Sequence, residues 1–306
     1  MHTIQSNEPN IEQTDRLFGI LPDASGRGKL TEIIKENNGE LELITLGRSI
    51  LSRPIEAMKI GKGEKKICIF ASHHAMENIT VNIAFLIGLY LSKPALSASL
   101  QSANIPLILN KYTYYVVPCV NPDGVELYFH GADENLLRER QIRMSGGDFS
   151  SWQANARGVD LNYNYGYRFE ERKAYENERG IKAGKEMYAG QYEESEPECR
   201  SVANFIRLIN PYAVVSLGAD GDGLYYAPKE ACTERIATRI VKATACGFNT
   251  ARDTEDYAGL YNYTGALGIP SFDLKVGKSK FPLSKADVRR VADVVARGII
   301  LLPTYL

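Results

Sequence analysis

The stretch Lys66–Ala71, KICIFA, is a continuous apolar run of the kind that a strand buried on both faces of a sheet shows. Directly after it, Asn78–Leu91 carries apolar residues at helical spacing. Two more runs, Tyr112–Val120 and Ala213–Leu217, also read as buried strands. Buried strands that alternate with helices predict a layered fold in which helices pack on a sheet.

The rest of the chain continues this alternation. Further strands are expected at Leu41–Leu46 and Ile55–Ile60, which form a hairpin, and at Ser271–Val276. Further helices are expected at Glu196–Ile209, Glu230–Cys246 and Lys285–Leu302. The polar, glycine-rich stretch Glu126–Tyr192 has weak periodicity, and we expect it to form long ordered loops that carry a site. The pattern predicts an α/β sandwich with helices on both faces of a mixed sheet.

Composition limits the function classes. The chain has 306 residues, 44% of them hydrophobic, so we expect one domain over residues 1–306, with an N-terminal extension at residues 1–30. Its net charge of −1 gives no electrostatic reason to bind nucleic acid or an anionic membrane. The longest apolar run, Val81–Leu91, is too short to span a bilayer. Without a secretory signal or CxxC spacing among the five cysteines, we expect a cytoplasmic protein with buried free thiols.

The first chemical motif is His74-Ala75-Met76-Glu77, at the carboxyl end of a buried strand. Open α/β sheets place their ligands at that edge, and an imidazole beside a carboxylate is a reasonable first half of a zinc site. Alone the motif is a weak signal. The four histidines are His2, His73, His74 and His130, so no histidine follows position 130.

Three later motifs change this reading: Asn121–Gly124 (NPDG), which reads as a tight turn, Trp152–Asn162 (WQANARGVDLN) and Gly268–Phe272 (GIPSF). In this order and spacing they resemble the zinc carboxypeptidase family, and within it the bacterial γ-D-glutamyl-L-diamino acid endopeptidases, which trim peptidoglycan stem peptides. The resemblance runs from about Gly47 to Pro282. It implies a three-layer α/β/α sandwich around a mixed, mostly parallel eight-stranded sheet. It also implies a zinc ion held by two His and one Glu, a Glu general base and an Arg that stabilises the oxyanion.

The resemblance assigns roles residue by residue. His74 and Glu77 match the first two zinc ligands, and Asn162 matches the substrate-binding Asn. Arg157 is the candidate for the oxyanion Arg, and Tyr257 for the Tyr that caps the substrate.

Three positions depart from the family pattern. Tyr163 stands where carboxypeptidases have the Arg that grips a terminal carboxylate, a loss that the endopeptidase branch also tolerates. Gly218 stands in place of the third zinc ligand, and Lys275 in place of the general base. Two ligands bind zinc much more weakly than three, and a Lys repels the metal. We therefore predict that zinc binding is weakened or absent and that Lys275 lies within salt-bridge distance of Glu77.

Other residues offer ways to restore the chemistry. Asp220 follows Gly218 closely and is the candidate substitute ligand. Asp273 shares a strand face with Lys275 and is a candidate displaced base, and a desolvated Lys275 is itself another. The sequence thus predicts a catalytically impaired family member whose cleft binds a peptide or peptidoglycan stem peptide. The alternative is an active metallocarboxypeptidase or γ-D-glutamyl-diamino acid endopeptidase with a substitute ligand such as Asp220.

Overall fold

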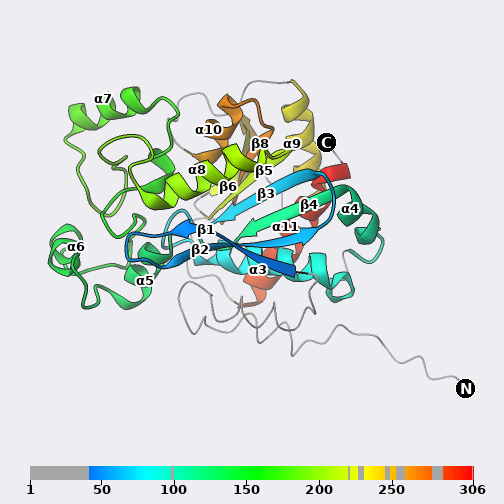
Figure 1. Ribbon diagram of the computed structural model, residues 1–306, viewed down its shortest axis with the longest axis horizontal. Coiled ribbons are helices and arrows are strands. Elements are labelled where there is room, and N and C mark those ends of the chain that lie inside the picture. Colours follow the sequence, from blue (N-terminus) through cyan, green and yellow to red (C-terminus); the bar gives the residue numbers. More distant parts are fainter. Residues whose placement is uncertain are drawn as a thin grey trace, which may run out of the picture.

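The computed structural model describes residues 41–97, 100–219, 221–226, 231–244, 249–252, 259–277, 285–304 and 306 (Figure 1). The strands are β1 (Leu41–Arg48), β2 (Pro54–Gly61), β3 (Lys65–Ala71), β4 (Tyr112–Val117), β5 (Ala213–Gly218), β6 (Gly221–Tyr226), β7 (Asn249–Arg252) and β8 (Ser271–Gly277). The helices are α3 (Asn78–Ser92), α4 (Ile105–Lys111), α5 (Pro122–His130), α6 (Arg138–Ser145), α7 (Phe169–Arg179), α8 (Pro197–Ile209), α9 (Ala231–Thr244), α10 (Leu260–Ala266) and α11 (Lys285–Ile300). Short 3-10 helices cover Pro94–Leu96, Leu161–Tyr163 and Leu302–Thr304.

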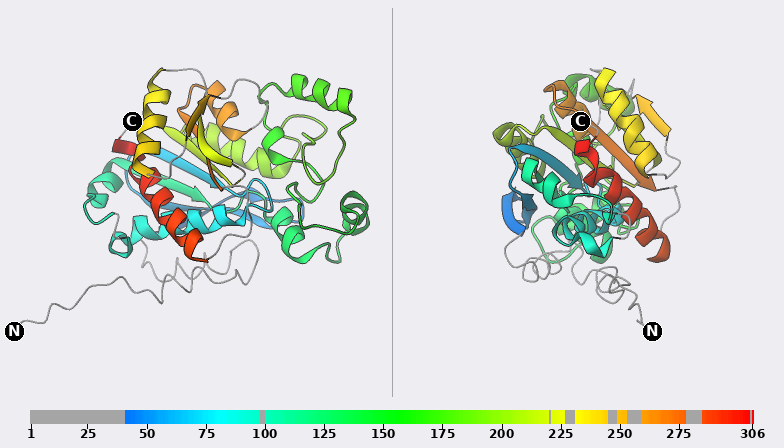
Figure 2. Two further views of the ribbon diagram at one scale, coloured as in Figure 1. Left: turned by 180° about the vertical axis from the view of Figure 1, so that it is seen from behind. Right: turned by 90° about the vertical axis from the view of Figure 1, so that its right-hand side faces the viewer.

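The strands form one mixed sheet of eight, in the order β1-β2-β4-β3-β5-β8-β6-β7. The central strands β4, β3, β5 and β8 run parallel to one another, and β2 and β6 run antiparallel to their neighbours in that core. Helices cover both faces (Figure 2). The structure therefore confirms the predicted α/β sandwich and its mixed, mostly parallel sheet.

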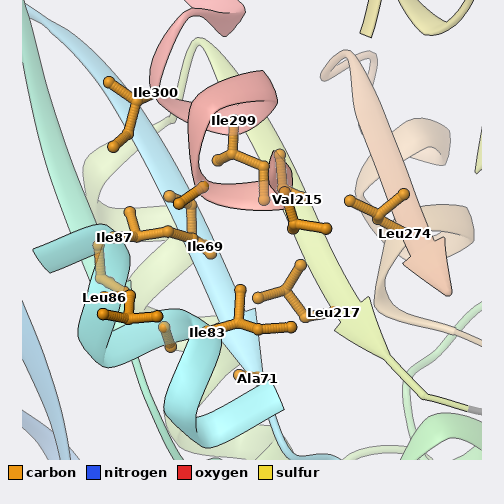
Figure 3. Packing of buried hydrophobic residues seen from close by; sticks show 14 of the residues in the cluster. Ile69, Ala71, Ile83, Leu86, Ile87, Val215, Leu217, Leu274, Ile299 and Ile300 are labelled. Carbon is orange, nitrogen blue, oxygen red and sulfur yellow. The ribbon is translucent and has the colours of Figure 1, made fainter. Parts of the chain in front are cut away.

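Strand β3 shows why KICIFA has no polar position. Ile67, Ile69 and Ala71 face one layer, where they belong to a cluster with residues of α3, α9 and α11. Figure 3 shows Ile69 and Ala71 with Ile83 of α3 and Ile299 of α11. Cys68 and Phe70 face the other layer, where they pack with residues of α8 and α10. Successive side chains of a strand point to opposite faces, so a strand covered on both sides needs an apolar residue at each position.

The long polar stretch, predicted as loops throughout, is mostly loop but also contains helices that were not predicted. Helices α5, α6 and α7 lie within or overlap Glu126–Tyr192. The NPDG motif, predicted as a tight turn, is instead the start of α5, where the Asn121 side chain accepts a hydrogen bond from the Gly124 N–H and caps the helix. Mostly polar helices such as α6 and α7 carry little apolar periodicity, which explains the error.

Smaller differences concern element ends. Strand β4 stops at Val117 and does not reach Val120, because Pro118 follows and has no N–H for the ladder. Helix α8 begins at Pro197, with Glu196 at its N-cap, close to the predicted start. The remaining predicted strands and helices lie within a few residues of the observed ones, while β6, β7, α4 and α10 were not predicted.

Three cysteines, Cys68, Cys119 and Cys199, are buried free thiols, as predicted. Cys232 lies in α9, but its side chain is not described, and Cys246 and the predicted extension at residues 1–30 lie outside what the structure describes. Within the described ranges, no helix combines the length and apolar character that crossing a bilayer requires.

Register brings the predicted site together. Ala71 of β3 pairs with Leu217 of β5, and Gly218 of β5 pairs with Lys275 of β8. Because these three strands are parallel neighbours, their carboxyl ends meet at one edge of the sheet. His74 and Glu77 lie in the segment that leaves β3 at the same edge.

Candidate active site

His74 and Glu77 are positioned by a short turn between β3 and α3. Ser72 adopts a left-handed conformation with φ of 55°, which turns the chain away from the sheet. Its backbone N–H donates to Thr80 Oγ1, and that hydroxyl donates to the Glu77 carbonyl oxygen. The turn is thereby fixed to the first turn of α3, with Glu77 at the N-cap position. Nδ1 of His74 lies 3.3 Å from Oε1 of Glu77, so the two predicted ligands face each other.

Asp160 holds the other side of the imidazole. Its Oδ1 lies 3.0 Å from Nε2 of His74, and its Oδ2 accepts a hydrogen bond from the Met187 N–H at 3.0 Å. A carboxylate on the far nitrogen is how proteins orient a histidine that binds metal through its near nitrogen. Asp160 lies two residues before Asn162 in the WQANARGVDLN motif, but its contact with His74 was not predicted from the sequence.

Asn162 also reaches the histidine. The amide nitrogen of its side chain lies 3.1 Å from Nε2 of His74. The structure thus gathers His74, Glu77, Asp160 and Asn162 at the predicted edge.

Charge compensation dominates this cluster. Burial alone would lower the pKa of His74, but the charges and hydrogen bonds of Asp160 and Glu77 raise it to about 10. Burial alone would raise the pKa of Glu77, but the cations of His74 and Lys275, with hydrogen bonds, lower it to about 2. The pKa of Asp160 also falls, because the neighbouring His74 outweighs burial. Buried charges therefore lie beside charges of opposite sign.

Gly218 and Lys275 form the second half of the site. A Cβ atom built on Gly218 would lie 2.5 Å from Nζ and 2.6 Å from Cδ of Lys275. Gly218 is not among the residues with positive φ, so its backbone would permit a side chain. The lysine side chain therefore fills the space into which a side chain at position 218 would project.

Lys275 lies at the edge of the cluster, with 17% of its side chain exposed. Its Nζ lies 3.3 Å from Oδ2 of Asp273. Burial raises the pKa of Asp273, and the nearby Lys275 opposes that shift. The lysine also acts electrostatically on Glu77, whose pKa it helps to lower. An ion pair between Lys275 and Glu77 stays a prediction.

The donor set can be tested against the zinc ion that the resemblance implies. Among the described residues, no three His, Cys, Asp or Glu side chains come together as a metal-binding group. His74 and Glu77 would supply two ligands, and Lys275 occupies the side of the site where position 218 would supply the third. The described residues therefore do not fit a zinc ion with three protein ligands. Asp220 and Tyr257 lie outside the described residues.

Two other predicted residues lie at the periphery. The Arg157 side chain is 45% exposed, and its Nη1 lies 3.7 Å from Oε2 of Glu196. The hydroxyl of Tyr163 donates to Sδ of Met187, and the guanidinium of Arg172 lies 3.6 Å from the centre of its ring. Tyr163 is thus held against α7 and the loop that follows it.

His73 and His130 have ordinary structural roles. Nε2 of His73 lies 2.9 Å from the hydroxyl of Tyr165, and burial, with the charge of His74 beside it, lowers its pKa to about 3. His73 therefore hydrogen-bonds behind the site as a neutral ring. His130 is half-exposed at the end of α5 and lies 3.8 Å from Glu126.

Comparison with known proteins identifies the class. A zinc carboxypeptidase family profile matches residues 29–271, and the chain belongs to the zinc carboxypeptidase family. It is 28% identical over 268 residues to γ-D-glutamyl-L-diamino acid endopeptidase 1 of Lysinibacillus sphaericus, an alignment that covers 85% of this chain. The chain spans only about two thirds (66%) of that relative's length.

Solved structures show the same fold. Thrombin activatable fibrinolysis inhibitor superposes with a TM-score of 0.73 at 17% identity, covering 94% of this chain and 74% of the other. Murein-tripeptide amidase MpaA from Escherichia coli O157 superposes with a TM-score of 0.52 at 19% identity, covering 88% of this chain and 95% of the other. At these identities the likeness establishes the architecture.

Proposed function

We propose that this protein is a catalytically impaired zinc carboxypeptidase relative that binds a peptide or a peptidoglycan stem peptide without hydrolysing it. In this proposal Asn162 and Tyr163 contact the ligand, Arg157 lies at the oxyanion position, and Tyr257 caps the ligand. Lys275 takes the place of the general base. No hydrolytic step is assigned to the site.

The observation that carries the proposal is the contact between Gly218 and Lys275. A lysine at position 275 replaces a carboxylate with a cation, and its side chain also fills the space of the missing ligand at 218. The two departures are therefore one structural change. An ammonium group within the charge field of Glu77 disfavours a divalent cation at the same place.

The ligand class rests on the relatives and on Tyr163. The names of the Lysinibacillus relative and of the amidase MpaA refer to γ-D-glutamyl and murein peptides. Tyr163 offers no bidentate cation for a terminal carboxylate, which suits a ligand bound through an internal linkage. A bacterial cytoplasmic location, where cell-wall peptides are recycled, belongs to the same proposal.

A second candidate function is an active metallopeptidase with a substitute ligand such as Asp220. One observation favours it: His74 and Glu77 face each other at 3.3 Å, with Asp160 orienting the imidazole. This half of the site retains the geometry of a metal site.

Peptide assays separate the two functions. Calorimetric titration with L-alanyl-γ-D-glutamyl-L-lysine should show saturable binding, and the isomer with an α-linked L-glutamate should bind more weakly. Prolonged incubation of the same peptide with the protein and added zinc should leave it intact by mass spectrometry. Zinc-dependent cleavage would contradict the proposal and establish the peptidase. Absence of binding to either peptide would contradict the assigned ligand class.

A further inference from the structure

A second concave site lies at the opposite edge of the sheet. A hollow of about 510 Å³ is lined by the segments that precede β5 and β8 and by one face of α9. Ligand pockets for small molecules typically have roughly 300–1,000 Å³, so this volume suits a small ligand. In Figures 1 and 2, α9 and the C-terminal end lie at one end of the molecule, and α5 and α6 lie at the other.

Two arginines on the rim have no acidic partner among the residues that the structure describes. Arg235 and Arg239 are exposed, are four residues apart on α9, and both line the hollow. Neither makes a hydrogen bond or ion pair with any residue that the structure describes. Like charges at this spacing on a helix repel each other. An anion bound between them would relieve that repulsion, and a guanidinium binds carboxylate or phosphate with two parallel hydrogen bonds.

The floor of the hollow is apolar. Ile236 and Ile269 are buried, and Pro270 lies beside them, while Leu267 leaves half of its side chain exposed at the rim. Asn210, held at φ of 44°, also lines the hollow. The arginines on the rim and the apolar residues beneath them indicate a ligand that carries both an anionic group and an apolar part. A bare ion would leave the apolar floor exposed to water.

The hollow is distinct from the candidate active site. Asn210 precedes β5 and Pro270 precedes β8, whereas Gly218 and Lys275 lie near the carboxyl ends of those strands. Strands of this length separate the two edges by about 20 Å. Ligands can therefore occupy both places at once.

We propose that this hollow is a second binding site, which takes a carboxylate or a phosphate carried on a short apolar body. Arg235 and Arg239 bind the anionic group, and Ile236, Ile269 and Pro270 contact the apolar body. The site does not depend on what the zinc-site residues bind.

Calorimetric titration of the full chain tests this site with four probes: octanoate, octyl phosphate, acetate and inorganic phosphate. The better of the two octyl probes should bind at least about tenfold more tightly than its short counterpart, because burying several methylene groups adds affinity. Whether octanoate or octyl phosphate binds more tightly assigns the anionic group. If neither octyl probe binds saturably, the proposal is wrong.

Matched variants locate the binding. Arg235→Gln/Arg239→Gln should weaken the octyl probe at least about tenfold, since both hydrogen-bonding cations are lost. The control Arg143→Gln/Arg179→Gln, at two other exposed arginines, should leave its affinity unchanged. Hydrogen exchange should slow at residues 235–239 and 267–270 when the probe binds. Equal affinity in the two double variants, or protection near His74 and Lys275 instead, would overturn the assignment.

Discussion

The two halves of the candidate site match the zinc carboxypeptidase pattern to different degrees. At the end of β3, His74, Glu77 and Asp160 retain the contacts of a histidine oriented to bind metal. At the ends of β5 and β8, a glycine and a lysine stand where the family resemblance implies a ligand and a base, and the lysine side chain fills the space above the glycine. The first half still has the donors of a metal site, while the second half supplies a cation.

Under the proposed function, this difference explains how the site keeps its fold without a metal. Removing a metal from a buried cluster leaves carboxylates with no counter-charge, which is costly. Lys275 supplies a counter-charge within reach of both Asp273 and Glu77. In the proposed metal-free site, the first half keeps its carboxylates because the second half supplies the counter-charge.

The largest expected effect comes from removing the carboxylate that both halves share. Glu77→Gln leaves His74 and Lys275 with less negative charge around them, and we expect unfolding free energy to fall by about 3 kcal/mol. Urea-induced unfolding of the wild type and the variant measures this difference in free energy. In a cluster of unpaired carboxylates awaiting a metal, the same change would instead stabilise the protein.

A control for this variant is Glu139→Gln, which removes an exposed partner of Arg143 at 3.8 Å. It should change the unfolding free energy by less than about 0.5 kcal/mol. Equal effects of the two variants would mean that Glu77 has no special electrostatic role.

Glu198 extends the comparison, because it is a buried acid that pairs with no cation in the part of the chain that the structure describes. Burial, together with the charges of Asp123 and Glu196, raises its pKa to about 8. The unfolded chain releases this proton near pH 4.3, so stability is greatest below that pH and falls as the pH rises towards 8. We expect a loss of roughly 3 kcal/mol between pH 5 and pH 8.

Unfolding experiments across this pH range measure the loss, and Glu198→Gln should flatten the profile because glutamine does not titrate. The backbone N–H of Ile50 still has an oxygen to donate to in that variant. A wild-type profile with the same slope as the variant would show that Glu198 is ionised in the folded protein.

A smaller effect is expected from refilling position 218 alone. Gly218→His places a ring against Lys275, and we expect this overpacking to lower the free energy of unfolding by about 2 kcal/mol. Gly184→His is the control, because the nearest atom to its Cβ is 3.6 Å away, and it should be nearly neutral. Adding Lys275→Ala to Gly218→His should recover most of the loss in thermal unfolding. Additive effects of the two changes would show that the residues are not coupled.

The sequence was sufficient to predict the central layer of the fold. Apolar runs such as KICIFA are required in strands covered on both faces, so β3 and β5 were predicted closely. Helix α7 is mostly polar and β6 is glycine-rich, and neither has the periodicity on which the prediction relied.

For the site, motif order placed His74 and Glu77 correctly at the sheet edge. The contact between Gly218 and Lys275 depends on the register of two strands that are more than fifty residues apart in the sequence. The contact of Asp160 with His74 depends on how the loop after α6 folds back onto the turn that follows β3. Neither relation has a local sequence signal, so both required the structure.

The smallest effect on stability is expected at Arg157, which the sequence analysis proposed for the oxyanion position. Its exposed contact with Glu196 predicts that Arg157→Gln lowers stability by less than about 1 kcal/mol. If the arginine contacts the ligand, affinity for L-alanyl-γ-D-glutamyl-L-lysine should fall severalfold in calorimetry. The control Arg179→Gln, at another exposed arginine, should leave affinity unchanged. Unchanged affinity in Arg157→Gln would remove this residue from the binding site.

The most direct test of the central claim is the zinc content of the purified protein after brief zinc exposure and desalting. Elemental analysis of the wild type should find no zinc above background, because Lys275 stands where the third ligand would project. Gly218→His/Lys275→Glu removes the cation and restores a third donor beside His74 and Glu77, so this variant should retain near-stoichiometric zinc. Near-stoichiometric zinc in the wild type would contradict the account and point to a substitute ligand such as Asp220.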